Sequence, residues 1–148
     1  GTAQSSHTGA GMATNSGVAY YGADGKRWVD NTEAAYGATF GTSDIISIAM
    51  DLDNDNVYFA KNGTWQNSGD PTSGATGTGA LSTDPVGDYF VMTMNMLYNP
   101  TTHFMNYGGY TTISISSAAA DANGYGTFEF APPTGFYALC TKNLAEYG

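Results

Sequence analysis

The most constraining feature of this sequence is an uninterrupted alternation of side chains between residues 46 and 53. Small or acidic residues separate four large apolar ones, which are Ile46, Ile48, Met50 and Leu52. Because successive side chains of a β-strand point to opposite faces, a period of two predicts a strand with one buried face. We expect Phe59 on the next strand to share that buried face, and Ser47 and Asp51 to face outward.

Turn-forming pairs place further strands around this one. Asp24-Gly25 predicts a tight turn in which both residues have positive φ, and Asn62-Gly63 predicts another before Trp65. With a turn at residues 53–56, the region around residues 46–65 becomes a two-hairpin meander. Later strands are expected at residues 89–97 and on both sides of a Pro-Pro turn within residues 127–144; the predicted core residues of the first are Phe90, Met92, Met94 and Met96.

Composition supports an all-β chain and excludes several functions. The 148 residues carry 4 Lys and Arg against 13 Asp and Glu, a net charge of −9, so we expect no nucleic-acid partner. Charged residues make up only 11% and Gly numbers 20, which disfavours a helix bundle or coiled coil. No apolar run approaches the roughly 20 residues that span a bilayer, so we expect no membrane insertion.

The length of the chain and its local composition predict the domain organisation. A chain of 148 residues is close to the usual size of one domain. Residues 1–17 are small and polar and predict an N-terminal arm, and residues 18–148 predict a single β-sandwich domain.

The stretch GTSDIISIAMDLDNDNVYFAKNGTWQNSGDP, residues 41–71, resembles the central signature of the SPRY (B30.2-like) family. MNYG at residues 105–108 is similar to a later element of that family. APPTGFYALCTKNL at 131–144 and the preceding ADANGYGTFEF look like the form found in SPRY-like domains of bacteriophage and marine viral structural proteins. Nothing in residues 1–17 resembles the family's opening strands, which indicates that the chain is a fragment of a longer polypeptide.

The resemblance implies a fold and a general role. The expected fold is a bent antiparallel β-sandwich of the jelly-roll or concanavalin-like, SPRY type, with very little helix. The expected function is a non-enzymatic binding or assembly module of a phage or viral particle, on a fibre, tail or capsid exterior. We therefore expect a virion location, a homo-oligomer, and partners among neighbouring virion subunits or a host-surface receptor. An unpaired edge left by missing strands would favour such assembly.

Few residues offer catalytic chemistry. The two histidines are His7 and His103, and no GxSxG motif accompanies them. Cys140 lies in the apolar run GFYALC and predicts a buried structural thiol. The three glutamates are Glu33, Glu129 and Glu146, without the paired spacing that a glycosidase strand would show. We predict no enzyme activity, no catalytic residues and no cofactor.

An acidic turn raises the question of calcium. Asp51, Asp53 and Asp55 alternate with asparagines, and calcium takes several carboxylate oxygens. The spacing does not fit an EF-hand loop, which would require Gly at position 56 and Glu at position 62. The residues fit a turn whose Asx side chains bond the local backbone, so we predict no metal site. The alternative function left open is a lectin-like carbohydrate-binding domain assisted by calcium at this turn.

The candidate partner-binding site is the long loop of residues 66–88. Gly, Ser, Thr, Asp and two prolines without periodicity predict a loop, and long loops on a rigid scaffold often carry recognition. We expect Trp65 and residues 66–80 to lie at one end of the sandwich and to carry most of the partner contact. The predicted partner-binding residues are Trp65, Gln66, Asp70, Thr72, Thr76 and Thr78.

Overall fold

The computed structural model describes residues 18–29, 32–82, 102–109 and 113–147. The predicted arm of residues 1–17 and the predicted strand of residues 89–97 lie outside the described residues. The chain forms two compact units, residues 1–100 and 101–148, and each is described by itself. The single domain over 18–148 stays a prediction. Among the helices in the described ranges, none is long and apolar enough to cross a membrane.

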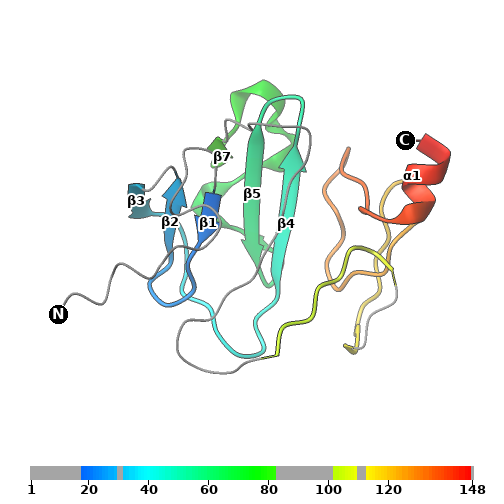
Figure 1. Ribbon diagram of the computed structural model, residues 1–148, viewed down its shortest axis with the longest axis horizontal. Helices are drawn as coiled ribbons and strands as arrows, with labels where there is room; N and C mark the ends of the chain where they lie inside the picture. Colours follow the sequence, from blue (N-terminus) through cyan, green and yellow to red (C-terminus); the bar gives the residue numbers. More distant parts are fainter. Residues whose placement is uncertain (1–17, 30–31, 83–101, 110–112, 148) are drawn as a thin grey trace. The chain divides into compact units, whose positions relative to one another are not determined.

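The first sheet is a three-stranded antiparallel meander of β1 (Val18–Tyr20), β2 (Lys26–Val29) and β3 (Thr32–Ala35) (Figure 1). The predicted two-residue turn is wrong in detail, because only Gly25 of the Asp24-Gly25 pair has positive φ. The amide of Tyr21 bonds the carbonyl of Lys26 at 2.8 Å, so four residues form the connection. Asp24 instead accepts a hydrogen bond from the amide of Lys26 at 3.0 Å, as Asx side chains do in turns.

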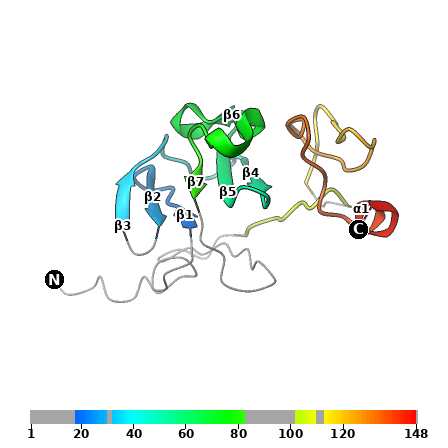
Figure 2. The ribbon, with the colours of Figure 1, turned by 90° about the horizontal axis from the view of Figure 1, so that it is seen from above.

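The second sheet contains the predicted meander. Its strands are β4 (Ile46–Asp51), β5 (Asn56–Lys61) and β6 (Thr64–Trp65), and β7 (Leu81–Ser82) pairs with the start of β5. Asn62 and Gly63 have φ of 48° and 79°, which is the left-handed pair that a tight two-residue hairpin requires. The β4–β5 turn occupies residues 52–55, where Asp55 has a φ of 55°. Figure 2 shows the two sheets next to each other within this unit.

The core lies between the two sheets. The pairing of Ile48 with Phe59 and of Met50 with Val57 places these side chains on one face of the second sheet. Packed around Phe59 and Val57 are the core residues Tyr36 and Leu81 and the flanking residues Val18, Tyr20, Val29, Ile46 and Met50. The predicted register is therefore correct, and the unit is an all-β, two-sheet sandwich of the expected class.

The predicted burial along β4 is partly wrong. Ile48 is 37% exposed and Leu52, which lies beyond the strand in the turn, is 58% exposed. Ala49, which shares its face of β4 with Ser47 and Asp51, is only 4% exposed, and it pairs with Tyr58, whose exposure is 0%. All five residues from Asn56 to Ala60 are buried, so β5 has two covered faces and alternation alone could not reveal the second.

The second unit is largely irregular. Where two strands were predicted within residues 127–144, the structure has only a single bridge between Ala119 and Phe128. The predicted closing strand is wrong at its end, because Thr141–Tyr147 forms the α-helix α1. Lys, Leu, Ala and Glu in this segment all favour helix, which explains the difference.

The centre of the second unit is a buried carboxylate. Asp121 accepts hydrogen bonds from the amides of Asn123, Tyr125 and Ala138 at 2.8–2.9 Å. Asn143 on α1 donates to the same carboxylate at 2.7 Å. Burial raises the pKa of Asp121, but these donors outweigh it and hold the pKa below its ordinary value.

Candidate functional site

The predicted binding loop follows the length of β5. From Trp65, which pairs with Ala60, the chain forms the 3₁₀-helices η2 (Gln66–Ser68) and η3 (Pro71–Thr76) and returns through β7 beside the start of β5. The hydroxyl of Ser73 lies 3.4 Å from that of Tyr58, in the middle of β5. The loop therefore covers the second face of β5, and its place at one end of the sandwich stays a prediction.

Gln66 attaches the beginning of the loop to the rest of the unit. Its side chain is 8% exposed and accepts a hydrogen bond from the amide of Ala38 at 2.8 Å. Its amide nitrogen donates to the carbonyl of Thr64 at 2.7 Å. The hydroxyl of Tyr20, which also donates to the carbonyl of Ala38, lies 3.4 Å from the Gln66 side-chain oxygen. Gln66 thus positions the loop, and little of it is left to meet a partner.

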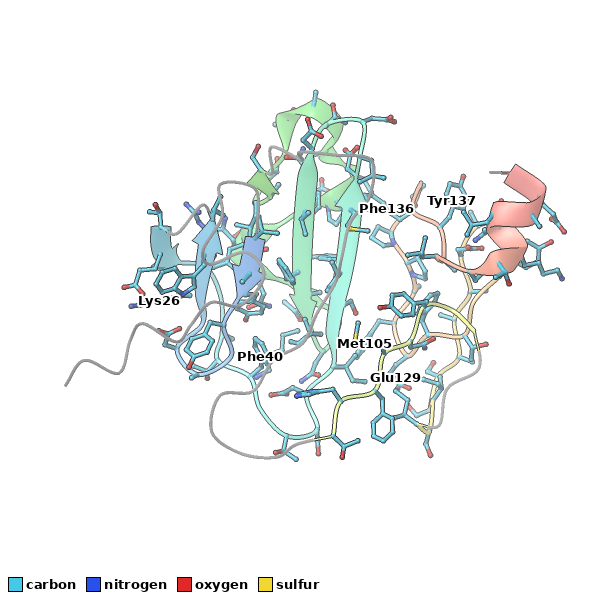
Figure 3. The ribbon with its side chains drawn as sticks, viewed as in Figure 1. Lys26, Phe40, Met105, Glu129, Phe136 and Tyr137 are labelled. Atoms are coloured by element: carbon cyan, nitrogen blue, oxygen red, sulfur yellow. The ribbon has the colours of Figure 1, made fainter. Side chains whose placement is uncertain are left out.

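Figure 3 shows the aromatic ring that backs this attachment, Phe40, below β1 and β5. Its ring centroid lies 4.8 Å from that of Tyr20. The amide of Phe40 donates to the carbonyl of Gly22 at 2.9 Å, which joins the first hairpin to the segment that Gln66 binds. The entry to the loop is consequently held by both sheets.

Asp70 begins η3 as its N-cap. One oxygen, Oδ1, accepts from both the amide and the hydroxyl of Thr72, at 2.9 and 2.6 Å. The hydrogen bond from the Thr72 hydroxyl lowers the pKa of Asp70 most, and the bond from the Thr72 amide lowers it further. The pKa lies below its ordinary value, so the side chain is an anion at neutral pH. Asp70 is exposed, and its other oxygen, Oδ2, has no hydrogen bond within the described part of the chain.

Ser73 is a loop residue that sequence reasoning missed. Its hydroxyl donates to the carbonyl of Asp70 at 2.7 Å and accepts from the amide of Thr78 at 2.9 Å. The amide of Asp70 in turn donates to the carbonyl of Thr78 at 3.0 Å. These bonds close residues 70–78 into a ring. The Asp-Pro pair before Thr72 was the available signal, since Asp at the N-cap and Pro at the first position begin helices.

The remaining predicted site residues differ in their exposure. Trp65 is half-buried and stacks edge-on against Tyr58, with ring centroids 6.5 Å apart. Thr72, Thr76 and Thr78 are all exposed on the ring of residues 70–78. The structure thus brings Asp70 and the three threonines together, while Trp65 and Gln66 lie at the entry to the loop.

The acidic turn after β4 adopts the predicted Asx arrangement. Asp51 accepts from the amides of Asp53 and Asn54 at 3.2 Å and from the Asn54 side chain at 2.8 Å. In the residues that the structure describes, no group of three or more His, Cys, Asp or Glu side chains is placed to hold a metal ion. The geometry of Asp51 follows from the turn itself.

The other chemically capable residues are dispersed. Cys140 is half-buried rather than fully buried as predicted. Glu129 accepts from the amide of Ser116 at 2.6 Å and from its hydroxyl, and these donors lower the pKa of Glu129. Glu146 accepts from the hydroxyl of Tyr125 at 2.6 Å, and Glu33 pairs with Lys26 at 2.8 Å. Their established partners are structural, and His7 lies outside the described residues.

Comparison with known proteins identifies the family. The family model of the SPRY domain matches residues 1–82, which is more than half of the chain. The chain belongs to the SPRY domain family. The matched residues contain both sheets of the first unit and the loop that covers β5, and they also include residues 1–17. The later motifs at 105–108 and 131–144 lie outside the match. No curated protein and no solved structure matches the chain.

Membership of the SPRY family gives the general role. SPRY domains are protein-interaction modules, and they are typically not enzymes. In the described part of this SPRY domain, the ring of residues 70–78 is a surface that combines a hydrogen-bonded backbone with exposed polar side chains.

Proposed function

We propose that this SPRY domain binds a protein partner through the outer surface of the ring of residues 70–78, with Trp65 at its edge. The observation that carries the proposal is the double role of Ser73, which joins Asp70 to Thr78 and so fixes the backbone under three exposed threonines. A surface that is already ordered loses little conformational entropy on binding. Partner contact by Trp65, Gln66, Asp70, Thr72, Thr76 and Thr78 remains a prediction, with Gln66 acting from beneath.

We further propose that the domain serves as an assembly or recognition module of a phage or viral particle, located on the virion. The support is the similarity of residues 120–130 and 131–144 to elements of viral SPRY-like domains. The partners would be neighbouring subunits, including further copies of this chain, or a host-surface receptor. The net charge of −9 disfavours nucleic acid as the bound component.

A displayed library of random peptides tests protein binding by the loop. The affinity of peptides enriched on the wild-type chain is then measured for two variants. Thr76→Arg adds bulk and charge at an exposed position of the loop, and Ala35→Arg makes the same change at an exposed position on β3. We expect at least a tenfold loss of affinity for Thr76→Arg and no change for Ala35→Arg. Equal affinities for all three proteins would contradict the proposed surface.

Two further measurements address the competing function and the assembly. A glycan array, with and without chelator, separates the lectin-like alternative; chelator-sensitive glycan binding without peptide binding would replace our proposal. Sedimentation equilibrium of the whole chain tests self-association. We expect a homo-oligomer, and a monomer that persists to high concentration would refute that part.

A further inference from the structure

Only four residues of this chain carry a positive side chain, and three of them are engaged. Lys26 pairs with Glu33 at 2.8 Å. Lys61 donates to the carbonyl of Thr39 at 2.8 Å and lies 3.3 Å from Asp44. The ammonium of Lys142 lies 4.5 Å from the centre of the Tyr125 ring. The fourth is Arg27, which has no hydrogen bond or ion pair with any residue of the described ranges.

The register of the first sheet determines where Arg27 points. Arg27 pairs with Tyr20 on one side and with Ala34 on the other. Opposed residues share a face, and Tyr20 packs on the core, so Arg27 lies on the core-facing side of β2. Its neighbour Lys26 lies on the opposite face, directed away from the second sheet (Figure 3).

Arg27 is partly shielded from solvent and lies near aromatic side chains. The side chain is half-buried, and its positive charge acts on Tyr36, a buried residue of the core. Burial raises the pKa of Tyr36, and the charge of Arg27 opposes that increase. The Tyr36 hydroxyl is already the acceptor for the amide of Phe59 at 3.2 Å. A guanidinium carries five N–H donors, and a half-buried one without an acceptor loses hydration without compensation.

We propose that Arg27 is an anchor for a carboxylate group of the bound protein partner. The inference rests on the proposed protein-binding function and adds the chemistry of one contact. The planar guanidinium matches a carboxylate with two parallel N–H···O bonds, a fit that a lysine cannot reproduce. The domain's negative charge repels polyanions at a distance, but at physiological salt this field is screened within about 8 Å, so a single carboxylate on a neutral or basic partner can approach.

The first test measures what the guanidinium does in the free protein. Arg27→Met retains an apolar side chain over the core and removes the charged head, and Arg27→Lys retains only the charge. If the Arg27 guanidinium has no structural role in the free protein, Arg27→Met should melt at the same temperature as wild type or at a higher one. A melting temperature lowered by several degrees would show a structural role and would overturn the proposal.

The second test measures the anion directly. The Arg27 Nε–Hε resonance is followed by NMR while sodium acetate replaces sodium chloride at constant ionic strength, with inorganic phosphate as a parallel arm. We expect a saturable shift with acetate, and an acetate-dependent rise in melting temperature that Arg27→Met and Arg27→Lys lack. A linear shift, or saturation by phosphate alone, would overturn the carboxylate assignment.

The two proposals can fail separately. Thr76→Arg disrupts the proposed loop surface but leaves the core-facing side of β2 unchanged, so its acetate response should equal that of wild type. If Thr76→Arg loses peptide binding but the wild-type protein shows no acetate response, only the proposed role of Arg27 is rejected. If the wild-type protein responds to acetate but Thr76→Arg binds peptides as wild type does, only the proposed loop surface is rejected.

Discussion

The amide of Gly37 donates a hydrogen bond to the carbonyl of Gly25 at 2.8 Å. This contact joins the turn between β1 and β2 to the segment that follows β3. The two backbones approach so closely that a Cβ added to Gly25 would overlap the carbonyl oxygen of Gly37. Gly25 also has a φ of 73°, in the left-handed region. The position therefore requires glycine for two independent reasons.

Replacement of Gly25 should destabilise the first unit. Gly25→Ala combines left-handed strain of about 1–2 kcal/mol with the overlap against Gly37, so we expect a loss of more than about 2 kcal/mol of unfolding free energy. Gly41→Ala is the matched control, because a Cβ there meets no atom within 4 Å. Denaturant unfolding followed by Trp28 and Trp65 fluorescence measures both. Equal stabilities would refute the close approach.

Ser73 should determine the order of the proposed binding loop. Ser73→Ala removes two side-chain hydrogen bonds and leaves the Thr78 amide without its partner, at a cost of about 1–3 kcal/mol to local stability. The Asp70 carbonyl keeps its bond from the backbone amide of residue 73. We expect faster hydrogen exchange across residues 70–78, with the strands unchanged. Thr76→Ala, at an exposed hydroxyl of the same loop, should leave exchange as in wild type. Indistinguishable exchange in both variants would remove Ser73 from this role.

A charge at Ala49 should destabilise the protein more than a charge at its neighbour Ile48, although isoleucine is the more hydrophobic residue. Ala49→Asp places a carboxylate on the covered face against Tyr58 and should unfold the unit. Ile48→Asp places it where over a third of the side chain is already exposed, so the protein should fold with a reduced melting temperature. Circular dichroism melts distinguish the two. A fully unfolded Ile48→Asp beside a folded Ala49→Asp would reverse our assignment of the faces.

Protonation of Asp121 at low pH should destabilise the second unit. The folded-state pKa lies below the unfolded value of about 3.9, so the stabilising contribution of Asp121 is complete above that pH and is lost as the pH falls through the folded-state pKa. We expect the protection factor of the Ala138 amide to fall in this acid range. Asp121→Asn should show low protection at every pH, and a wild-type profile without an acid limb would contradict the assignment.

The sequence determined the elements whose signals are local. The period of two in residues 46–51 and the left-handed Asn62-Gly63 turn define β4, β5 and β6 with the correct register, because a one-residue slip would move Ile46 and Met50 off the core face. Of the predicted site residues, Asp70, Thr72, Thr76 and Thr78 are exposed in the loop, whereas Gln66, at its entry, is buried.

Tertiary structure decided what local signals do not encode. Ala49 is buried because a loop some twenty residues later folds over Tyr58, and Ser73 matters because it meets Thr78 and Tyr58 in space. The segment after Cys140 became a helix rather than a strand, where Asn143 completes the shell of Asp121. Arg27 is notable only because, among the described residues, the other three cationic side chains have partners and Arg27 has none. Each depends on contacts between residues distant in the chain, whose free energy exceeds the weak local preferences that a sequence pattern reports.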